Sequence, residues 1–139
     1  MKRIAVLLVL ILALTCICCS CGTKYTWDDA FVDIEKIKDA QFVVYIEDTQ
    51  EQLAEFSEIL NWEIGREGLD PVELTHITSL HENLSVIVSF QEFATEQQAE
   101  QMYDYYHKVS NQQKLVRFGN IIISTNSDVA QEILGYDFI

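Results

Sequence analysis

Apolar residues recur three or four positions apart in four stretches of the chain, 26–40, 49–68, 95–111 and 127–135. This spacing places them on one side of a helix. Each stretch opens with a Ser or Thr side chain, which can accept a hydrogen bond from the first helical turn. The pattern therefore predicts four amphipathic helices, the last of them short.

The residues expected to face the core follow from the same spacing. They are Trp27, Phe31, Ile34 and Ile37 or Lys38 in the first helix; Leu53, Phe56, Leu60 and Ile64 in the second; and Ala99, Met102, Tyr106 and Val109 in the third.

Strands are predicted where β-branched and aromatic residues gather between the helices. Residues 41–48 form one buried strand, and residues 72–80 and 84–90 form a hairpin around a turn at 81–83. In the second arm of that hairpin, alternation assigns Leu84, Val86, Val88 and Phe90 to one face. Residues 114–125 form a second hairpin with Gly119 and Asn120 as its two-residue turn.

A weak internal repeat indicates how these elements are connected. The segments TQEQLAEF at Thr49 and TEQQAEQM at Thr95 align without gaps, and each lies between β segments. Two β-α-β halves joined by a hairpin predict a ferredoxin-like (βαββαβ) α+β fold with an antiparallel sheet. An N-terminal helix, an extra C-terminal hairpin strand and a short C-terminal helix complete it. The two long helices are expected on one sheet face, which leaves the other for the terminal helices or for a partner.

The N-terminal segment has the layout of a secretory signal. Lys2 and Arg3 precede an unbroken apolar run from Ile4 to Leu14, as in a charged n-region followed by an apolar h-region. A membrane-spanning helix needs about 20 apolar residues, which is longer than this run. A cleaved signal is therefore expected, with an uncleaved span as the second alternative.

Four cysteines follow the apolar run, Cys16, Cys18, Cys19 and Cys21, and no other cysteine occurs in the chain. Their spacing lacks two separated Cys-x-x-Cys pairs, so it does not favour zinc. The sequence CCSCGT resembles the cleavage region of a bacterial lipoprotein signal peptide, in which a small residue precedes the cysteine that is acylated. Cys21 fits best, although Cys18 stands where that family usually has Leu; Cys19 and Cys16 are the alternatives.

This resemblance covers residues 1–22 and implies three segments: a signal peptide over 1–20, a lipid-anchored tether over 21–26, and a single domain over 27–139. It also implies a diacylated, palmitate-type anchor in the cell membrane, with the domain on the extracytoplasmic face. Two acyl chains make such membrane residence stable. The mature domain would contain no disulfide, so its core must suffice to stabilise it.

The charge balance limits the classes of partner. The chain has 22 acidic against 9 basic residues and a formal net charge of −13. Nucleic-acid binding is not expected, because it depends on neutralising phosphates with Lys and Arg. A basic protein of the envelope is a possible partner, although a high net charge also serves solubility alone.

No recognisable catalytic motif is present. The chain lacks a Gly-x-Ser-x-Gly elbow, a Gly-rich phosphate loop and a calcium-binding loop. No catalytic residue, metal or cofactor is therefore expected. The alternative is a small surface enzyme or metal-handling protein that uses His76 and His81 with Glu73 or Glu82.

Three aromatic residues are candidates for an interaction surface. Trp62 lies off the apolar side of its helix, Tyr105 is expected to point outward, and Tyr103 is close to it in sequence. Exposed Trp and Tyr are typical of protein-binding surfaces, and packing against the N-terminal helix is the equally good alternative. The sequence thus favours a membrane-anchored, non-catalytic binding module.

Overall fold

The computed structural model describes residues 24–40, 43–46 and 49–139. The order of elements is α2 (Trp27–Lys38), β1 (Val43–Ile46), α3 (Gln50–Gly65), β2 (Leu74–Glu82), β3 (Ser85–Phe93), α4 (Glu96–Val109), β4 (Lys114–Phe118), β5 (Ile121–Thr125) and α5 (Asp128–Leu134).

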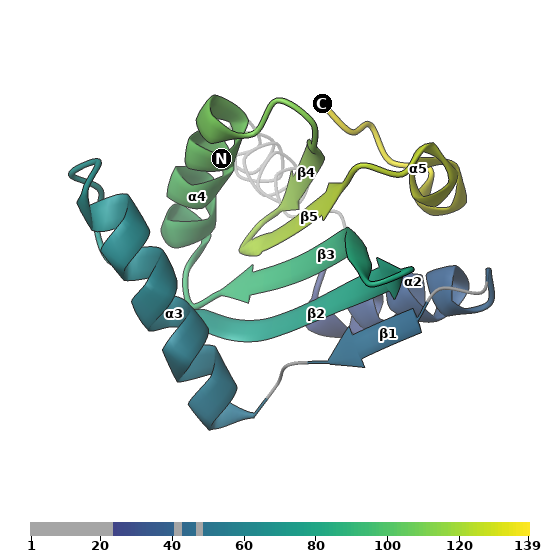
Figure 1. Ribbon diagram of the computed structural model, residues 1–139, viewed down its shortest axis with the longest axis horizontal. Coiled ribbons are helices and arrows are strands. Elements are labelled where there is room, and N and C mark those ends of the chain that lie inside the picture. Colours follow the sequence, from purple (N-terminus) through teal and green to yellow (C-terminus); the bar gives the residue numbers. More distant parts are fainter. Residues whose placement is uncertain (1–23, 41–42, 47–48) are drawn as a thin grey trace, which may run out of the picture.

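The strands form one five-stranded sheet in the order β1-β2-β3-β5-β4, and every neighbouring pair is antiparallel (Figure 1). The α+β class, the βαββαβ order of elements, the extra hairpin strand and both terminal helices are confirmed. The two halves differ in their pairing. β1 pairs directly with β2, whereas β5 separates β3 from β4, so only the second half is a split βαβ unit.

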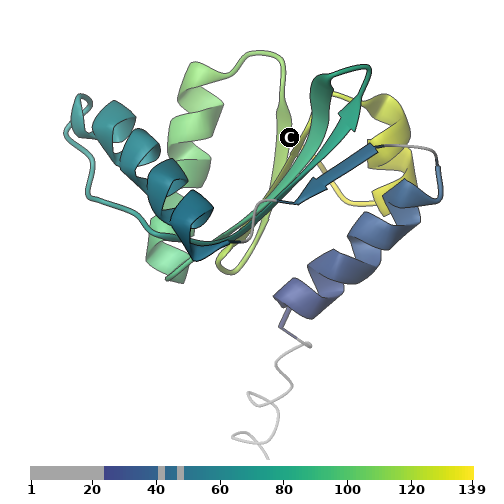
Figure 2. The same ribbon diagram turned by 60° about the horizontal axis from the view of Figure 1, so that its bottom comes forward.

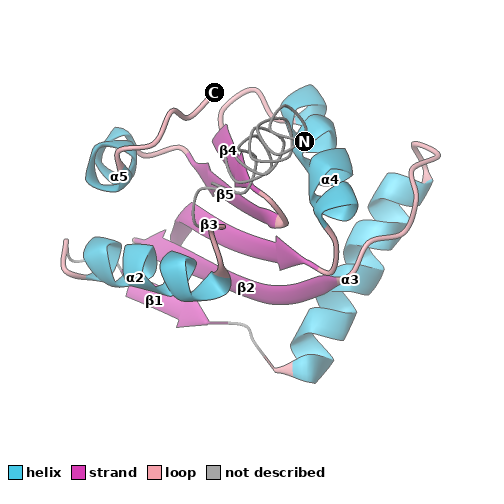
Figure 3. Cartoon of the chain, turned by 180° about the vertical axis from the view of Figure 1, so that it is seen from behind, coloured by secondary structure: helices cyan, strands magenta, loops and turns pink. Residues whose placement is uncertain are grey.

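Helices cover both faces of the sheet and give a three-layer arrangement. Figure 2 shows α3 and α4 on one side of the strands, with α2 and α5 on the other, and Figure 3 shows α2 crossing the sheet. The expected placement of the two long helices on one face is thus confirmed, and of the two alternatives for the other face the structure shows the terminal helices. Because α2 and α5 cover the second face, that face is not an open surface for a partner.

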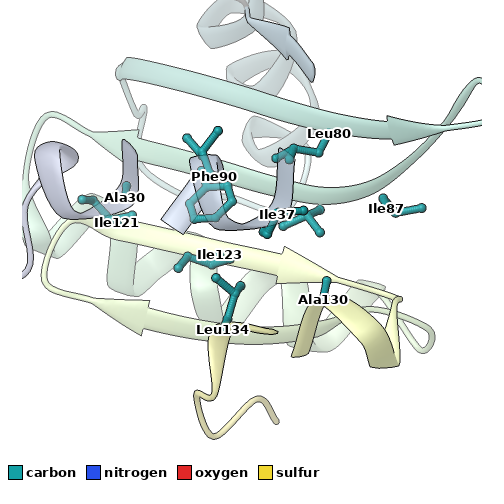
Figure 4. Packing of buried hydrophobic residues seen from close by; sticks show 11 residues of the cluster. Ala30, Ile37, Leu80, Ile87, Phe90, Ile121, Ile123, Ala130 and Leu134 are labelled. Carbon is teal, nitrogen blue, oxygen red and sulfur yellow. The ribbon is translucent and has the colours of Figure 1, made fainter. Parts of the chain in front are cut away.

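Each face has its own apolar core. Ile121 and Ile123 belong to the cluster under α2 and α5, whereas Ile122 between them belongs to the cluster under α3 and α4. Figure 4 shows Phe90 and Ile123 of the sheet gathered with Ile37 of α2 and Leu134 of α5. Alternation along β5 therefore buries apolar side chains on both faces, as in a central strand.

Side-chain caps are present at the predicted helix starts. Thr49, Thr95 and Ser127 each accept a hydrogen bond from the backbone N–H three residues later. Thr26 forms a capping box with Asp29. At the other end of α5, Gly135 takes a left-handed conformation with φ 69°, which glycine adopts without steric cost.

Two helices are rotated relative to the expected apolar sides. In α2 the buried residues include Ala30 and Asp33, and Phe31 is 53% exposed. In α4 Tyr105 is buried, while Val109 at the helix end is 52% exposed. Both helices carry more apolar residues than one side can hold, so periodicity alone did not define the buried side.

The first hairpin turn begins two residues later than predicted and ends one residue later. β2 continues through Glu82, and the turn consists of Asn83 and Leu84, both with positive φ. Leu84 is therefore not on a strand face, and Val86 is 40% exposed, whereas Val88 and Phe90 are buried as expected.

The expected signal peptide, Cys16, Cys19 and Cys21 lie outside the described residues. Of the expected tether, Lys24 to Thr26 are described. Tyr25 packs on the domain, with its ring centroid 4.6 Å from that of Phe118. Within the described ranges, no helix combines the length and the apolar character that a membrane span requires.

Candidate functional site

Trp62 lies on the outward side of α3 and is 68% exposed. The core-facing residues Leu53 and Ile64 of the same helix are almost fully buried. A helix turns about 100° per residue, so Trp62, two positions before Ile64, points away from the core. The expectation that Trp62 lies off the apolar side is confirmed.

An apolar neighbour and a cation accompany Trp62. Ile59, one turn earlier, is 53% exposed. The guanidinium carbon of Arg66 lies 5.2 Å from the centroid of the Trp62 ring, which is cation–π distance. This contact holds the indole at the surface rather than against the core.

Carboxylates follow the same side of α3. Glu51, Glu55 and Glu58 are exposed, and together with Trp62 they have the spacing i, i+4, i+7 and i+11, which is one helix face. Between Gln50 and Gly65 the helix contains no basic residue. We call this surface the Trp62 face; it comprises Glu51, Glu55, Glu58, Ile59, Trp62 and Arg66.

The expectation that Tyr105 points outward is wrong. Its side chain is 7% exposed, and its hydroxyl donates a 2.9 Å hydrogen bond to Glu63 on α3. Ala99, Met102 and Tyr105, each three residues apart, form the buried side of α4. Tyr105 thus joins the two helices instead of forming a binding surface.

Tyr106 is half-buried and donates a 2.8 Å hydrogen bond to the side-chain oxygen of Gln91 on β3. Burial raises the pKa of this phenol well above its usual value. The adjacent tyrosines Tyr105 and Tyr106 therefore both serve packing, one between the helices and one against the sheet.

Tyr103 does not extend the Trp62 face. It lies about 200° around α4 from Tyr105, which places it on the side away from α3. The ring is half-buried against the core, and its centroid lies 4.5 Å from that of His107 in an edge-on arrangement.

The histidines proposed for an alternative site are not brought together. Nδ1 of His76 lies 2.8 Å from Oε1 of Glu92, and the ring stacks on Trp27 with centroids 4.8 Å apart. His81 is five residues further along β2, about 17 Å in an extended strand. Over the described ranges, no three His, Cys, Asp or Glu side chains converge as a metal site would require.

The sequence did not identify a buried carboxylate on α2. Asp33 is 2% exposed and accepts hydrogen bonds from the hydroxyls of Tyr25 at 2.8 Å and Tyr136 at 2.5 Å. Nζ of Lys36 lies 2.7 Å from its other oxygen. Burial and the bond to Asp33 raise the pKa of both phenols, that of Tyr136 to about 12.

This cluster joins both ends of the described chain. Tyr25 precedes α2, and Tyr136 follows α5. Four residues therefore fix the start and the end of the domain to the same helix. A signal was present in the sequence, since an acid three residues after Ala30 and four before Ile37 falls on the buried side of α2.

No protein-family model, curated protein or solved structure matches this chain.

Proposed function

We propose that this protein is an extracytoplasmic lipoprotein that is anchored through Cys21 and binds a basic protein of the cell envelope through the Trp62 face. The observation that carries the proposal is the 68% exposed Trp62 among carboxylates. Trp and Arg are the residues most enriched among those that dominate protein–protein binding energy. Burial of Trp62 in a partner would remove from water the aromatic side chain with the largest exposed fraction among the described residues.

Charge complementarity defines the partner. Three exposed glutamates follow one face of α3, and Arg66 is the only cation of that surface. A partner with an apolar pocket for the indole and Lys or Arg around it would pair with these carboxylates. Such complementarity mainly accelerates association and excludes acidic competitors.

The position of Tyr25 supports display of the domain directly at a membrane. Its hydroxyl and ring are both held by the domain. Four peptide units join Cys21 to Tyr25, and they span at most about 14 Å whatever their conformation. An acylated Cys21 would therefore keep the domain next to the bilayer, within reach of other envelope proteins.

The anchor is tested by intact-mass spectrometry of the protein from the membrane fraction of the native cells. A diacylated chain that starts at Cys21, and that is lost in Cys21→Ala, is expected. A diacylated chain that starts at Cys19 or Cys16 would show that this cysteine, and not Cys21, is the acylated residue. A full-length chain without lipid would refute the lipoprotein proposal.

The binding face is tested by photocrosslinking in the same cells, with a photoreactive residue at Ile59. The adduct with a basic protein should fall at least tenfold in Trp62→Ala, because a central aromatic contact is worth about 2 kcal/mol or more. Phe31→Ala is the matched control, since Phe31 is a similarly exposed aromatic residue on α2. Glu55→Lys should weaken the adduct, and added salt should do the same. Equal effects of Trp62→Ala and Phe31→Ala would refute the proposed face.

A further inference from the structure

The segment that precedes α2 is fixed to the domain by Tyr25. Its hydroxyl donates a 2.8 Å hydrogen bond to Asp33, which is 2% exposed. Its ring packs on two rings of the domain, with its centroid 4.6 Å from that of Phe118 and 6.3 Å from that of Tyr136. A hydrogen bond to a buried carboxylate is among the stronger side-chain interactions of a protein. Terminal residues of a domain are poorly ordered unless contacts of this kind tie them down.

The residues on either side of Tyr25 have contacts of their own. Lys24 crosses the β4–β5 turn, and its Cε lies 3.7 Å from the position that a β-carbon on Gly119 would occupy. Thr26 forms the capping box with Asp29 at the start of α2. The chain is therefore held at three consecutive positions before the helix begins.

A protease that cuts after Lys24 would need this part of the chain to detach. Lys24 is exposed, so its charged side chain is accessible to a protease that recognises lysine. Cleavage also requires the backbone around the cleaved bond to be free of contacts that fix it. Tyr25 would have to leave Asp33 first. Protection of the bond between Lys24 and Tyr25 thus depends on the contacts of Tyr25 and not on burial of Lys24.

We propose that Tyr25 is a latch that holds residues 24–26 on the domain and thereby protects the link to the N-terminal segment from proteolysis. The consequence for the cell rests on the proposed function: with Cys21 acylated, a cut after Lys24 releases the whole domain from the membrane. The latch is a conformational device, because it can be open or closed while the domain stays folded.

Opening of the latch requires neither separation of the strands nor loss of α2, because Tyr25 lies outside these elements. Asp33 keeps two partners when Tyr25 leaves, since Tyr136 donates to it and Nζ of Lys36 lies 2.7 Å from its other oxygen. The buried carboxylate therefore stays hydrogen-bonded and paired with a cation. Opening is a local transition, which costs less free energy than unfolding of the domain.

A purely structural role of Tyr25 predicts a different behaviour. Tyr136 donates to the same carboxylate oxygen of Asp33 from the other end of the described chain. Removal of either hydroxyl takes one donor from a buried acid, so both variants should lower the stability of the domain. Only loss of the Tyr25 hydroxyl also weakens the hold on residues 24–26. Tyr136→Phe is therefore the matched control for Tyr25→Phe.

The test is limited proteolysis of the full chain, purified in mild detergent from the native cells. Trypsin is added under native conditions, and mass spectrometry follows the rate of cleavage after each lysine. In Tyr25→Phe, cleavage after Lys24 should accelerate by about tenfold or more, because the rate follows the population of the open segment. In Tyr136→Phe this rate should change by less than about threefold. Cleavage after Lys38, at the end of α2, should be similar in the parent and both variants.

The proposal would be overturned if Tyr25→Phe did not accelerate cleavage after Lys24, or if the two variants accelerated it equally. Equal acceleration after Lys24 and Lys38 would also overturn it, because the whole domain would then be opening. The intact mass of the same preparations shows separately whether Cys21 is acylated. A chain without lipid would refute the anchor, and the comparison of the two variants would still decide whether Tyr25 is a latch.

Discussion

The hydroxyl of Tyr136 donates a 2.5 Å hydrogen bond to the carboxylate of Asp33, across 103 residues of sequence. The same carboxylate oxygen accepts from Tyr25. A buried carboxylate is stable in a core only when it is hydrogen-bonded and its charge is balanced, and Lys36 supplies the balancing charge. One acidic side chain on α2 therefore holds residues near both ends of the described chain.

Loss of this carboxylate should destabilise the domain strongly. Asp33→Ala leaves two phenols without their acceptor, and we expect it to lower the free energy of unfolding by about 3 kcal/mol. Urea denaturation measures the change. Asp104→Ala, at an exposed position of α4, should change the stability by less than about 0.5 kcal/mol. Equal losses in the two variants would contradict the role of Asp33.

Alkaline conditions should unfold the protein through its buried phenols. The pKa of Tyr136 is raised to about 12, and burial also raises the pKa of Tyr25 and Tyr106. A tyrosine in the unfolded chain ionises near pH 10. Stability is therefore fully present below about pH 10 and is lost as the pH rises toward the folded-state pKa, because only the unfolded state releases its protons. Unfolding free energies measured from about pH 8 to 12 should show this decline, and Tyr136→Phe should make it shallower. A stability that does not change between about pH 10 and 12 would contradict the prediction.

Local signals in the sequence were sufficient to predict most elements. Caps such as Thr49 and Ser127 lie at the predicted helix starts, and the Gly119–Asn120 turn separates the last two strands as expected. These features depend on residues within one turn of each other. The amphipathic pattern placed the two long helices on one sheet face but left the other face open to the terminal helices or to a partner, because an apolar side can be buried against either.

Long-range pairing could not be predicted in the same way. The repeat at Thr49 and Thr95 indicated two similar halves, but β1 pairs with β2 and β5 separates β3 from β4. Similar caps and apolar spacing do not specify which strand edges meet. The apolar character of Leu84 likewise indicated a strand, although the residue lies in the turn.

The candidate surface was predictable only in part. Trp62 is exposed because it lies off the apolar side of a helix whose core side is well defined. In α4 the neighbouring residues Tyr105 and Tyr106 could each have faced the core, and both contribute to packing. A helix with surplus aromatic residues has no single orientation that its sequence alone determines.

Two adjacent isoleucines in β5 should contribute equally to the stability of the domain, although they lie in different apolar clusters. Ile122 is 1% exposed beneath α3 and α4, and Ile123 is 0% exposed on the opposite face. Alanine at either position should lower the unfolding free energy by about 2–4 kcal/mol. The double variant should show nearly additive losses, because the side chains share no packing partner across the sheet. Thermal or urea denaturation measures these changes. A loss of stability for only one of the two alanine variants would mean that one sheet face is not packed against its helices.

Asn61 holds the backbone that leads into β2. Its amide donates to the carbonyl of Val72 at 2.9 Å and accepts from the N–H of Val72 at 2.7 Å, as a neighbouring strand would. Gln101 makes the same pair of bonds to Asp70. Val72 is 4% exposed, whereas Asp70 is exposed and water can replace the lost amide there. Asn61→Ala should therefore cost about 2 kcal/mol, and Gln101→Ala less than about 1 kcal/mol. Hydrogen exchange of the Val72 amide should accelerate in Asn61→Ala only. Similar exchange rates and stabilities in the two variants would contradict the prediction that burial determines how much these hydrogen bonds contribute to stability.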